Sequence, residues 1–159
     1  MTSISQSPQD YFRLLLLTVV GQAFTAAGYT LEDRPAQWSG GLFRFAKPLD
    51  DSLTAFIEYQ LLAYADTMWA SRNPSRFRVT LTRTDQPAPR LPSAHPNFIQ
   101  RDLGTLVVQD FAVAILPGPD YWWTFTTTDE LGKALAESGH LVIGFGMPWL
   151  SGELLPPSA

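Results

Sequence analysis

The sequence predicts a single α+β domain, an antiparallel sheet of about five strands with the N-terminal and C-terminal helices packed on one face. Apolar residues recur with helical spacing over residues 7–27 and 128–146, whereas residues 29–126 alternate between apolar and polar positions and contain many turn residues. A chain of 159 residues, 45% of them hydrophobic and 16% charged, is long enough to bury one core. We therefore expect one globular domain over residues 1–159.

The first helix has recognisable start and end residues. Ser7 is a favoured cap for free helix amides, Pro8 suits the first helical position, and Asp10 places an acid in the first turn. Gly28 predicts a left-handed end after Ala27. Apolar residues form two stripes along this helix, with Tyr11, Leu14, Leu15, Val19 and Ala23 in one and Phe12, Leu16, Val20, Phe24 and Ala27 in the other. An apolar surface this wide predicts a helix packed on a sheet.

The longest alternating segment is Leu53–Tyr64, which is apolar on both faces and rich in aromatic and β-branched residues. This pattern predicts a long central strand. Its odd-numbered residues, from Leu53 to Ala63, are expected to face the core. The opposite face is polar in the middle, at Glu58 and Gln60.

Other strands are expected at Tyr29–Arg34, Gly41–Ala46, Arg76–Thr84, Leu103–Leu116 and Tyr121–Thr126. A turn over residues 35–40 is expected to join the first two. The segment over residues 85–97 holds four prolines and predicts an irregular loop that crosses the fold. The last helix is expected to begin at Thr128-Asp129-Glu130 and to end before Pro148.

Composition and charge exclude several classes of function. The chain has no cysteine, which excludes disulfides, thiolate catalysis and Cys-ligated metals. The N-terminal residues do not have the pattern of a signal peptide, and the apolar run Leu14–Val20 is too short to cross a membrane. A net charge of −4 gives no reason to expect nucleic-acid binding. We expect a cytoplasmic protein that binds neither nucleic acid nor membrane.

No catalytic or cofactor motif is present in the sequence. The two histidines, His95 and His140, lack a partner at metal-ligand spacing, and no serine lies in a G-x-S-x-G motif. Ser39-Gly40-Gly41 precedes a predicted strand rather than a helix, which argues against a phosphate-binding loop. We therefore expect no metal and no cofactor, and a binding protein rather than an enzyme.

Charge is distributed unevenly along the chain. Residues 72–101 hold six arginines and one acid, a balance of +5, so the rest of the chain carries −9. If the predicted strands pair antiparallel, one polar face of the sheet carries Arg44, Glu58, Gln60, Arg76 and Arg78. This face is interpreted either as a binding surface for an anion or an acidic protein partner, or as a solvated face with cross-strand Glu–Arg pairs. Aromatic residues at Tyr121-Trp122-Trp123 and Met147–Leu150 similarly form either a binding groove or anchors for the last helix.

The order of these landmarks resembles the bacterial domain-of-unknown-function family numbered 4304. The resemblance rests on a helix ending at Gly28-Tyr29, then Trp38, Arg44-Phe45, Gln60 in a long strand, Arg76-Phe77-Arg78-Val79, Trp122-Trp123 and a closing Gly146-Met147-Pro148-Trp149-Leu150. It covers most of the chain, from about Leu15 to Leu150, and implies a bacterial α+β domain. It implies no activity and no functional residues.

Two function classes follow from the sequence. The first is a non-enzymatic binding or interaction module, such as an accessory or immunity-type protein. The second is a small-molecule-binding protein or hydrolase with its site on the polar sheet face. A pocket that holds a perturbed Glu58 beside Arg78 would favour the second class, and a flat polar face would favour the first.

Overall fold

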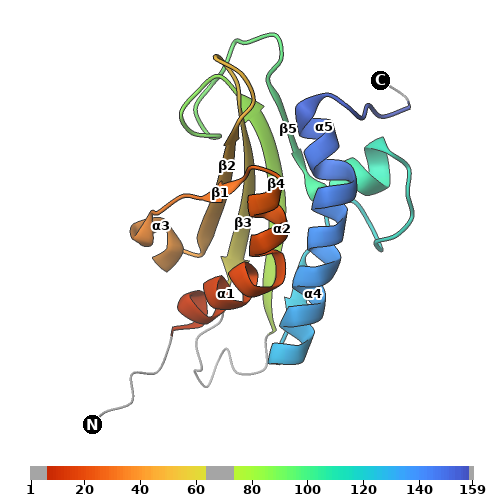
Figure 1. Ribbon diagram of the computed structural model, residues 1–159. Helices are drawn as coiled ribbons and strands as arrows, with labels where there is room; N and C mark the ends of the chain where they lie inside the picture. The colour runs from red at the N-terminus through yellow and green to blue at the C-terminus, as the bar shows by residue number, and fades with distance from the viewer. Residues whose placement is uncertain (1–6, 64–73, 158–159) are drawn as a thin grey trace.

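The computed structural model describes residues 7–63 and 74–157, which form an antiparallel sheet with helices on one side (Figure 1). Within these residues the sheet has six strands, in the order β1-β2-β3-β4-β5 with β6 also paired to β4. The strands are β1 (Thr30–Leu31), β2 (Leu42–Pro48), β3 (Thr54–Leu62), β4 (Ser75–Thr84), β5 (Ile99–Asp102) and β6 (Trp123–Phe125). The predicted long segment is therefore the central strand, β3. Its predicted last residue, Tyr64, lies outside the described residues.

Two long helical segments cover one face of the sheet (Figure 1). The first consists of α1 (Pro8–Leu16), a π-helical segment over Leu17–Gly21 and α2 (Gln22–Ala26). The second consists of α4 (Thr128–Leu141), a π-helical segment over Val142–Gly146 and α5 (Met147–Ser151). The predicted α+β fold, with both terminal helices on the same face, is confirmed. We call the helix-covered side the inner face and the other side the outer face.

The core lies between the inner face and the helices. Odd-numbered residues of β3 are buried there, and they pair in register with inward residues of β4, as Ile57 with Leu81 and Tyr59 with Val79. Phe12 of α1 contacts Phe43 of β2, with ring centroids 5.2 Å apart. The predicted facing of β3 and β4 is therefore confirmed, and aromatic rings join the first helix to the sheet.

Only one of the two apolar stripes on the first helix is buried. Phe12, Leu16, Val20 and Phe24 are at most 3% exposed, whereas Leu14 of the other stripe is 50% exposed. The buried residues recur every four positions. A π-helical segment has more residues per turn than an α-helix, so the segment over Leu17–Gly21 keeps this four-residue stripe facing the sheet.

The predicted strand at Leu103–Leu116 is wrong. Strand β5 ends at Asp102, and Thr105–Asp110 forms a π-helical segment that buries Leu106 and Val107. An apolar run with no clear period fits a strand or a buried helix equally well. Gly104 lies between β5 and this helical segment. Glycine is needed there because an added Cβ would lie 2.5 Å from the carbonyl oxygen of Pro119.

Three further boundaries differ from the predictions. The first strand is only Thr30–Leu31, and residues predicted as a turn contain the short helix α3 (Pro35–Ser39). The last helix has Thr127 as its cap and continues past Pro148 to Ser151. Proline has no amide proton and cannot donate the usual helical hydrogen bond. The π-helical segment before Pro148 has a different hydrogen-bond spacing, and the helix therefore continues past the proline.

The proline-rich segment over residues 85–97 is an irregular loop, as predicted, and it covers one end of the outer face. Thr82 and Thr84 point outward from β4, yet both are completely buried. The side-chain amide of Gln100 donates to Thr82 Oγ1 at 3.0 Å and to the carbonyl oxygen of Pro89 at 3.3 Å. The loop therefore leaves only the other end of the outer face accessible.

Candidate functional site

The outer face brings together the five residues predicted from the sequence. Arg44 of β2 pairs in register with Glu58 of β3, and Gln60 of β3 pairs with Arg78 of β4. Arg76 lies two residues before Arg78 on the same strand and therefore on the same face. The antiparallel pairing on which the prediction depended is thus present. The five side chains nevertheless have different surroundings, which divide them into two groups.

Arg44 and Glu58 belong to a buried ionic cluster. Their side chains are 5% and 7% exposed, with Arg44 Nη1 3.5 Å from Glu58 Oε2. Arg44 Nε also donates to Glu32 Oε1 at 2.5 Å, and its guanidinium lies 5.5 Å from the ring centroid of Phe56. A buried guanidinium shared by two carboxylates connects the edge of the sheet to its centre. Arg44 is therefore a structural residue and is not available to a partner.

Burial raises the pKa of the Glu58 carboxyl above its ordinary value, and nearby Glu32 raises it further. Arg44 and Arg90 oppose this rise, which indicates that the proline-rich loop brings Arg90 close to the cluster. Arg78 stands opposite Gln60 rather than Glu58. Within the described residues, the ion pair that Glu58 forms is with Arg44 rather than with Arg78.

Arg76 and Arg78 form the second group, together with Trp122. The two guanidinium carbons lie 4.5 Å and 4.8 Å from the centroid of the Trp122 ring. The Arg78 side chain is 41% exposed, and its Nη1 lies 4.0 Å from Asp102 Oδ2. Within the described residues, the Nε atoms of both arginines are buried without a hydrogen-bond partner. The indole ring therefore supports two arginines whose remaining nitrogens can bind carboxylates bidentately.

Trp122 was expected to belong to a binding groove or to anchor the last helix, but it was not placed with the arginines. Its neighbour Trp123 packs inward, stacking on Phe77 and donating from Nε1 to Glu137 of α4 at 2.8 Å. Trp123 is thus the predicted anchor of the last helix. Successive residues in an extended segment point to opposite faces, so Trp122 must point outward. That alternation is the sequence feature that identifies Trp122 as an outer-face residue.

The arginines of the basic segment do not form one surface. Arg83 is on the inner side, where its Nη1 donates to the carbonyl oxygen of Leu150 at 2.9 Å. Arg101 pairs with Asp110 at 3.0 Å, and Arg90 lies near the Glu58 cluster. Arg72 lies outside the described residues. Arg76 and Arg78 are the arginines of this segment that lie together on one aromatic ring of the outer face.

The two histidines lie in different parts of the fold, His95 in the proline-rich loop and His140 on the last helix. His95 Nδ1 accepts a hydrogen bond from the Asn97 amide at 3.0 Å, within the proline-rich loop. His140 is an exposed residue near the end of α4. No three potential metal ligands come together in the described parts of the chain. In the same parts, no helix has both the length and the apolar character needed to cross a membrane.

The fold and this surface define a small α+β domain whose outer face presents two arginines on a tryptophan. Comparison of the chain with protein-family models, curated proteins and solved structures finds no match in any of the three. The resemblance to the domain-of-unknown-function family 4304 therefore stays a prediction.

Proposed function

We propose that this protein is a non-enzymatic binding module whose outer face docks an acidic segment of a protein partner. The observation that supports the proposal is the contact of Arg76 and Arg78 with one Trp122 ring. Tryptophan and arginine are the residues most often found at energetic hot spots of protein interfaces. A shared aromatic support restricts the movement of both guanidinium groups, so less side-chain entropy is lost when a partner binds.

Electrostatics support an acidic partner. The whole chain has a net charge of −4, so two arginines on the outer face create a local positive field on an otherwise acidic protein. Such a field orients an approaching acidic surface and increases its association rate. An accessory or immunity-type role in a bacterial cytoplasm belongs to the same proposal, because modules of this kind act by binding another protein.

The alternative function is a small-molecule or hydrolase site at Glu58. The raised pKa of Glu58 favours it, since catalytic carboxyl groups are often perturbed in this direction. The geometry favours the binding module instead, because the Glu58 side chain is 7% exposed and its Oε2 faces Arg44. A substrate would have to displace this ion pair to reach the carboxylate.

The binding proposal is tested by titrating the isotopically labelled protein with an oligoglutamate peptide and recording nuclear magnetic resonance spectra. We expect saturable shifts at Arg76, Arg78 and the Trp122 indole that weaken as salt is added, because the contact is ionic. The double change Arg76→Glu/Arg78→Glu should reduce affinity at least about tenfold, the effect of losing charge-assisted hydrogen bonds.

The matched control is Arg13→Glu/Lys133→Glu, which changes the net charge equally at other surfaces. Arg13 also lies over a tryptophan, with its guanidinium carbon 4.3 Å from the Trp38 ring centroid, so the control includes an Arg–Trp contact. This variant should bind the peptide nearly as well as the unchanged protein. Equal losses in the two variants, or shifts that spread over the whole surface, would show nonspecific attraction and contradict the proposal.

A further inference from the structure

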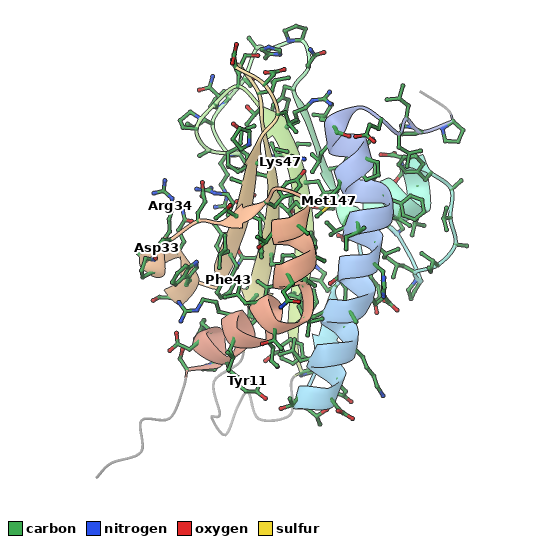
Figure 2. The ribbon with its side chains drawn as sticks, in the orientation of Figure 1. Tyr11, Asp33, Arg34, Phe43, Lys47 and Met147 are labelled. Atoms are coloured by element: carbon green, nitrogen blue, oxygen red, sulfur yellow. The ribbon has the colours of Figure 1, made fainter. Side chains whose placement is uncertain are left out.

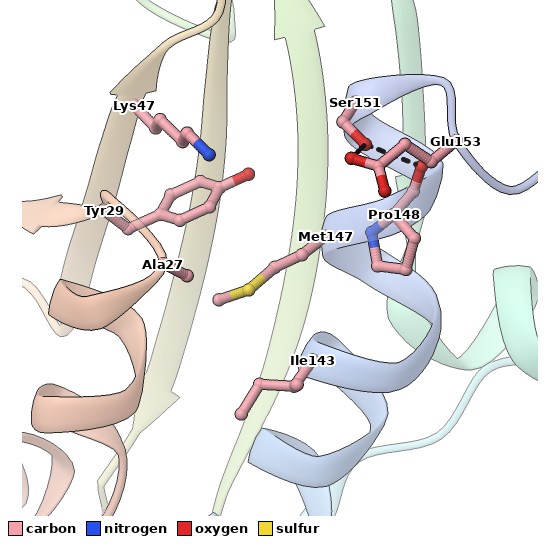
Figure 3. A pocket seen from close by; sticks show the side chains of 8 residues that line it. All are labelled: Ala27, Tyr29, Lys47, Ile143, Met147, Pro148, Ser151 and Glu153. Carbon is pink, nitrogen blue, oxygen red and sulfur yellow. Dashed lines mark hydrogen bonds between the residues drawn. The ribbon is translucent and has the colours of Figure 1, made fainter.

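A cleft on the inner side of the sheet lies apart from the outer face. It is bounded by the end of α2, strand β2 and helix α5, and it has a volume of about 350 Å³ (Figure 3). A second hollow of about 460 Å³ shares Lys47 and Ser151 with it and extends toward Asn97. Figure 2 shows that Lys47 comes from the sheet and Met147 from the C-terminal helix. The cleft therefore lies where the two layers of the fold separate.

Lys47 provides a positive charge inside this cleft. It follows Phe43 and Phe45 on the inward side of β2, but the core ends before it, and its side chain extends into open space (Figure 3). Its ammonium lies 5.6 Å from the Tyr29 ring centroid and forms no ion pair within the described residues. The stem packs against Gly28, where an added Cβ would lie 3.1 Å from Lys47 Cε. Gly28 also has a φ of 95°, a left-handed conformation that favours glycine. The backbone conformation and the close approach of Lys47 therefore both favour glycine at this position.

Tyr29 supplies a hydrogen-bond donor beside the ammonium. Its side chain is 2% exposed, and its hydroxyl points into the cleft (Figure 3). Burial raises the pKa of Tyr29 to about 12, which keeps the hydroxyl protonated at neutral pH. An ammonium and a protonated hydroxyl that point into the same space form a donor pair suited to one carboxylate.

The opposite wall determines the remaining chemistry. Met147 and Ile143 present an apolar surface across from Lys47 (Figure 3). Glu153 lies on the rim, where its Oε1 accepts a hydrogen bond from Ser151 Oγ at 3.0 Å. The Glu153 carboxylate repels additional negative charge, so a ligand with a single negative charge is favoured over a phosphate dianion.

Arg83, at the far end of the second hollow, is already held by the fold. Its Nε donates to the carbonyl oxygen of Asn97 and its Nη1 to that of Leu150, both at 2.9 Å. Lys47 is therefore the cation of the cleft that a ligand can approach without disrupting a contact between secondary-structure elements.

We propose that this cleft binds a small monocarboxylate with a short apolar chain. The carboxylate accepts from Lys47 Nζ and the Tyr29 hydroxyl, and the chain packs on Met147 and Ile143. This site is independent of the outer face, because it lies on the opposite side of the sheet and uses none of the same residues.

The test is a titration of the full chain with hexanoate, followed by nuclear magnetic resonance of the backbone amides and of the Lys47 side chain. Saturable shifts are expected at Gly28, Tyr29, Lys47 and Met147 at millimolar hexanoate. Hexanol lacks the charge and inorganic phosphate lacks the chain, so each should bind at least about tenfold more weakly.

Lys47→Met keeps the length and apolar packing of the stem and should weaken hexanoate binding at least about tenfold. The matched control is Lys133→Met, since Lys133 is the other lysine of the chain and is exposed on α4. Tyr29→Phe removes only the hydroxyl and gives a second test if Lys47→Met folds poorly. The proposal is overturned if hexanol or phosphate binds as well as hexanoate, if no saturable shift occurs, or if neither Lys47→Met nor Tyr29→Phe weakens binding.

Discussion

The two faces of strands β3 and β4 differ in what their side chains do. On the inner face, Ile57 and Phe77 are completely buried under the helices. On the outer face, Glu58 of β3 forms a buried ion pair with Arg44 of the neighbouring strand β2, and β4 carries an accessible Arg–Trp surface at Arg76 and Arg78. Alternate residues of one strand thus serve different purposes. The inner residues stabilise the fold, and part of the outer face is available for recognition.

The largest expected effect on the free energy of unfolding comes from a substitution on the inner face. Phe77→Ala should lower the free energy of unfolding by about 3–5 kcal/mol, because it leaves a cavity among the rings of Phe12, Tyr59 and Trp123. Its neighbour on the outer face is the matched control, since Arg78→Ala removes an exposed pair worth at most about 1 kcal/mol. Urea denaturation of both variants measures the difference. Equal losses would contradict the assignment of the two faces.

The next effect concerns the buried ion pair. Arg44→Met should cost about 3 kcal/mol, because it leaves the buried Glu58 carboxylate without its cation. The double variant Arg44→Met/Glu58→Leu should recover much of this loss, since two apolar side chains of similar size can replace a buried pair. Thermal and urea unfolding of the single and double variants test the coupling. If the losses of Arg44→Met alone and Glu58→Leu alone simply add in the double variant, the pair is not coupled as described.

A smaller effect on stability comes from the titration of Glu58 and depends on pH. Because burial raises the pKa of Glu58, the folded protein binds this proton more tightly than the unfolded chain does. The contribution of Glu58 to stability is therefore greatest below the ordinary Glu pKa and is lost as pH rises through the raised folded value. Glu58→Gln should remove this dependence, with a net change of about 1 kcal/mol or less at neutral pH because the attraction to Arg44 is lost too. The prediction is refuted if the free energy of unfolding depends on pH in the same way in the unchanged protein and in Glu58→Gln.

The strands with strict alternation were predictable from the sequence. The predicted Arg76–Thr84 differs by one residue from β4, and Leu53–Tyr64 contains all of β3. A period of two over many residues determines both the conformation and the buried face. Residues 103–116 have no such period, so local pattern did not distinguish a strand from the buried helical segment that forms there.

The candidate site was predictable only in part. The pairing of β3 with β4 placed Glu58, Gln60 and Arg78 on one face, as expected. The contact of Trp122 with the arginines depends on the pairing of β6 with β4, which joins segments far apart in the sequence. The cleft at Lys47 depends on where the helix layer ends, so no local pattern near Lys47 indicated it.

The free energy of unfolding of Arg76→Glu/Arg78→Glu tests most directly whether these arginines serve recognition rather than stability. We predict a loss of about 1 kcal/mol or less, because the Arg78–Asp102 ion pair is partly exposed and such pairs contribute little to folding. A loss of about 3 kcal/mol or more, as expected for broken buried contacts, would show that Trp122 and the two arginines are structural and would contradict their role in recognition.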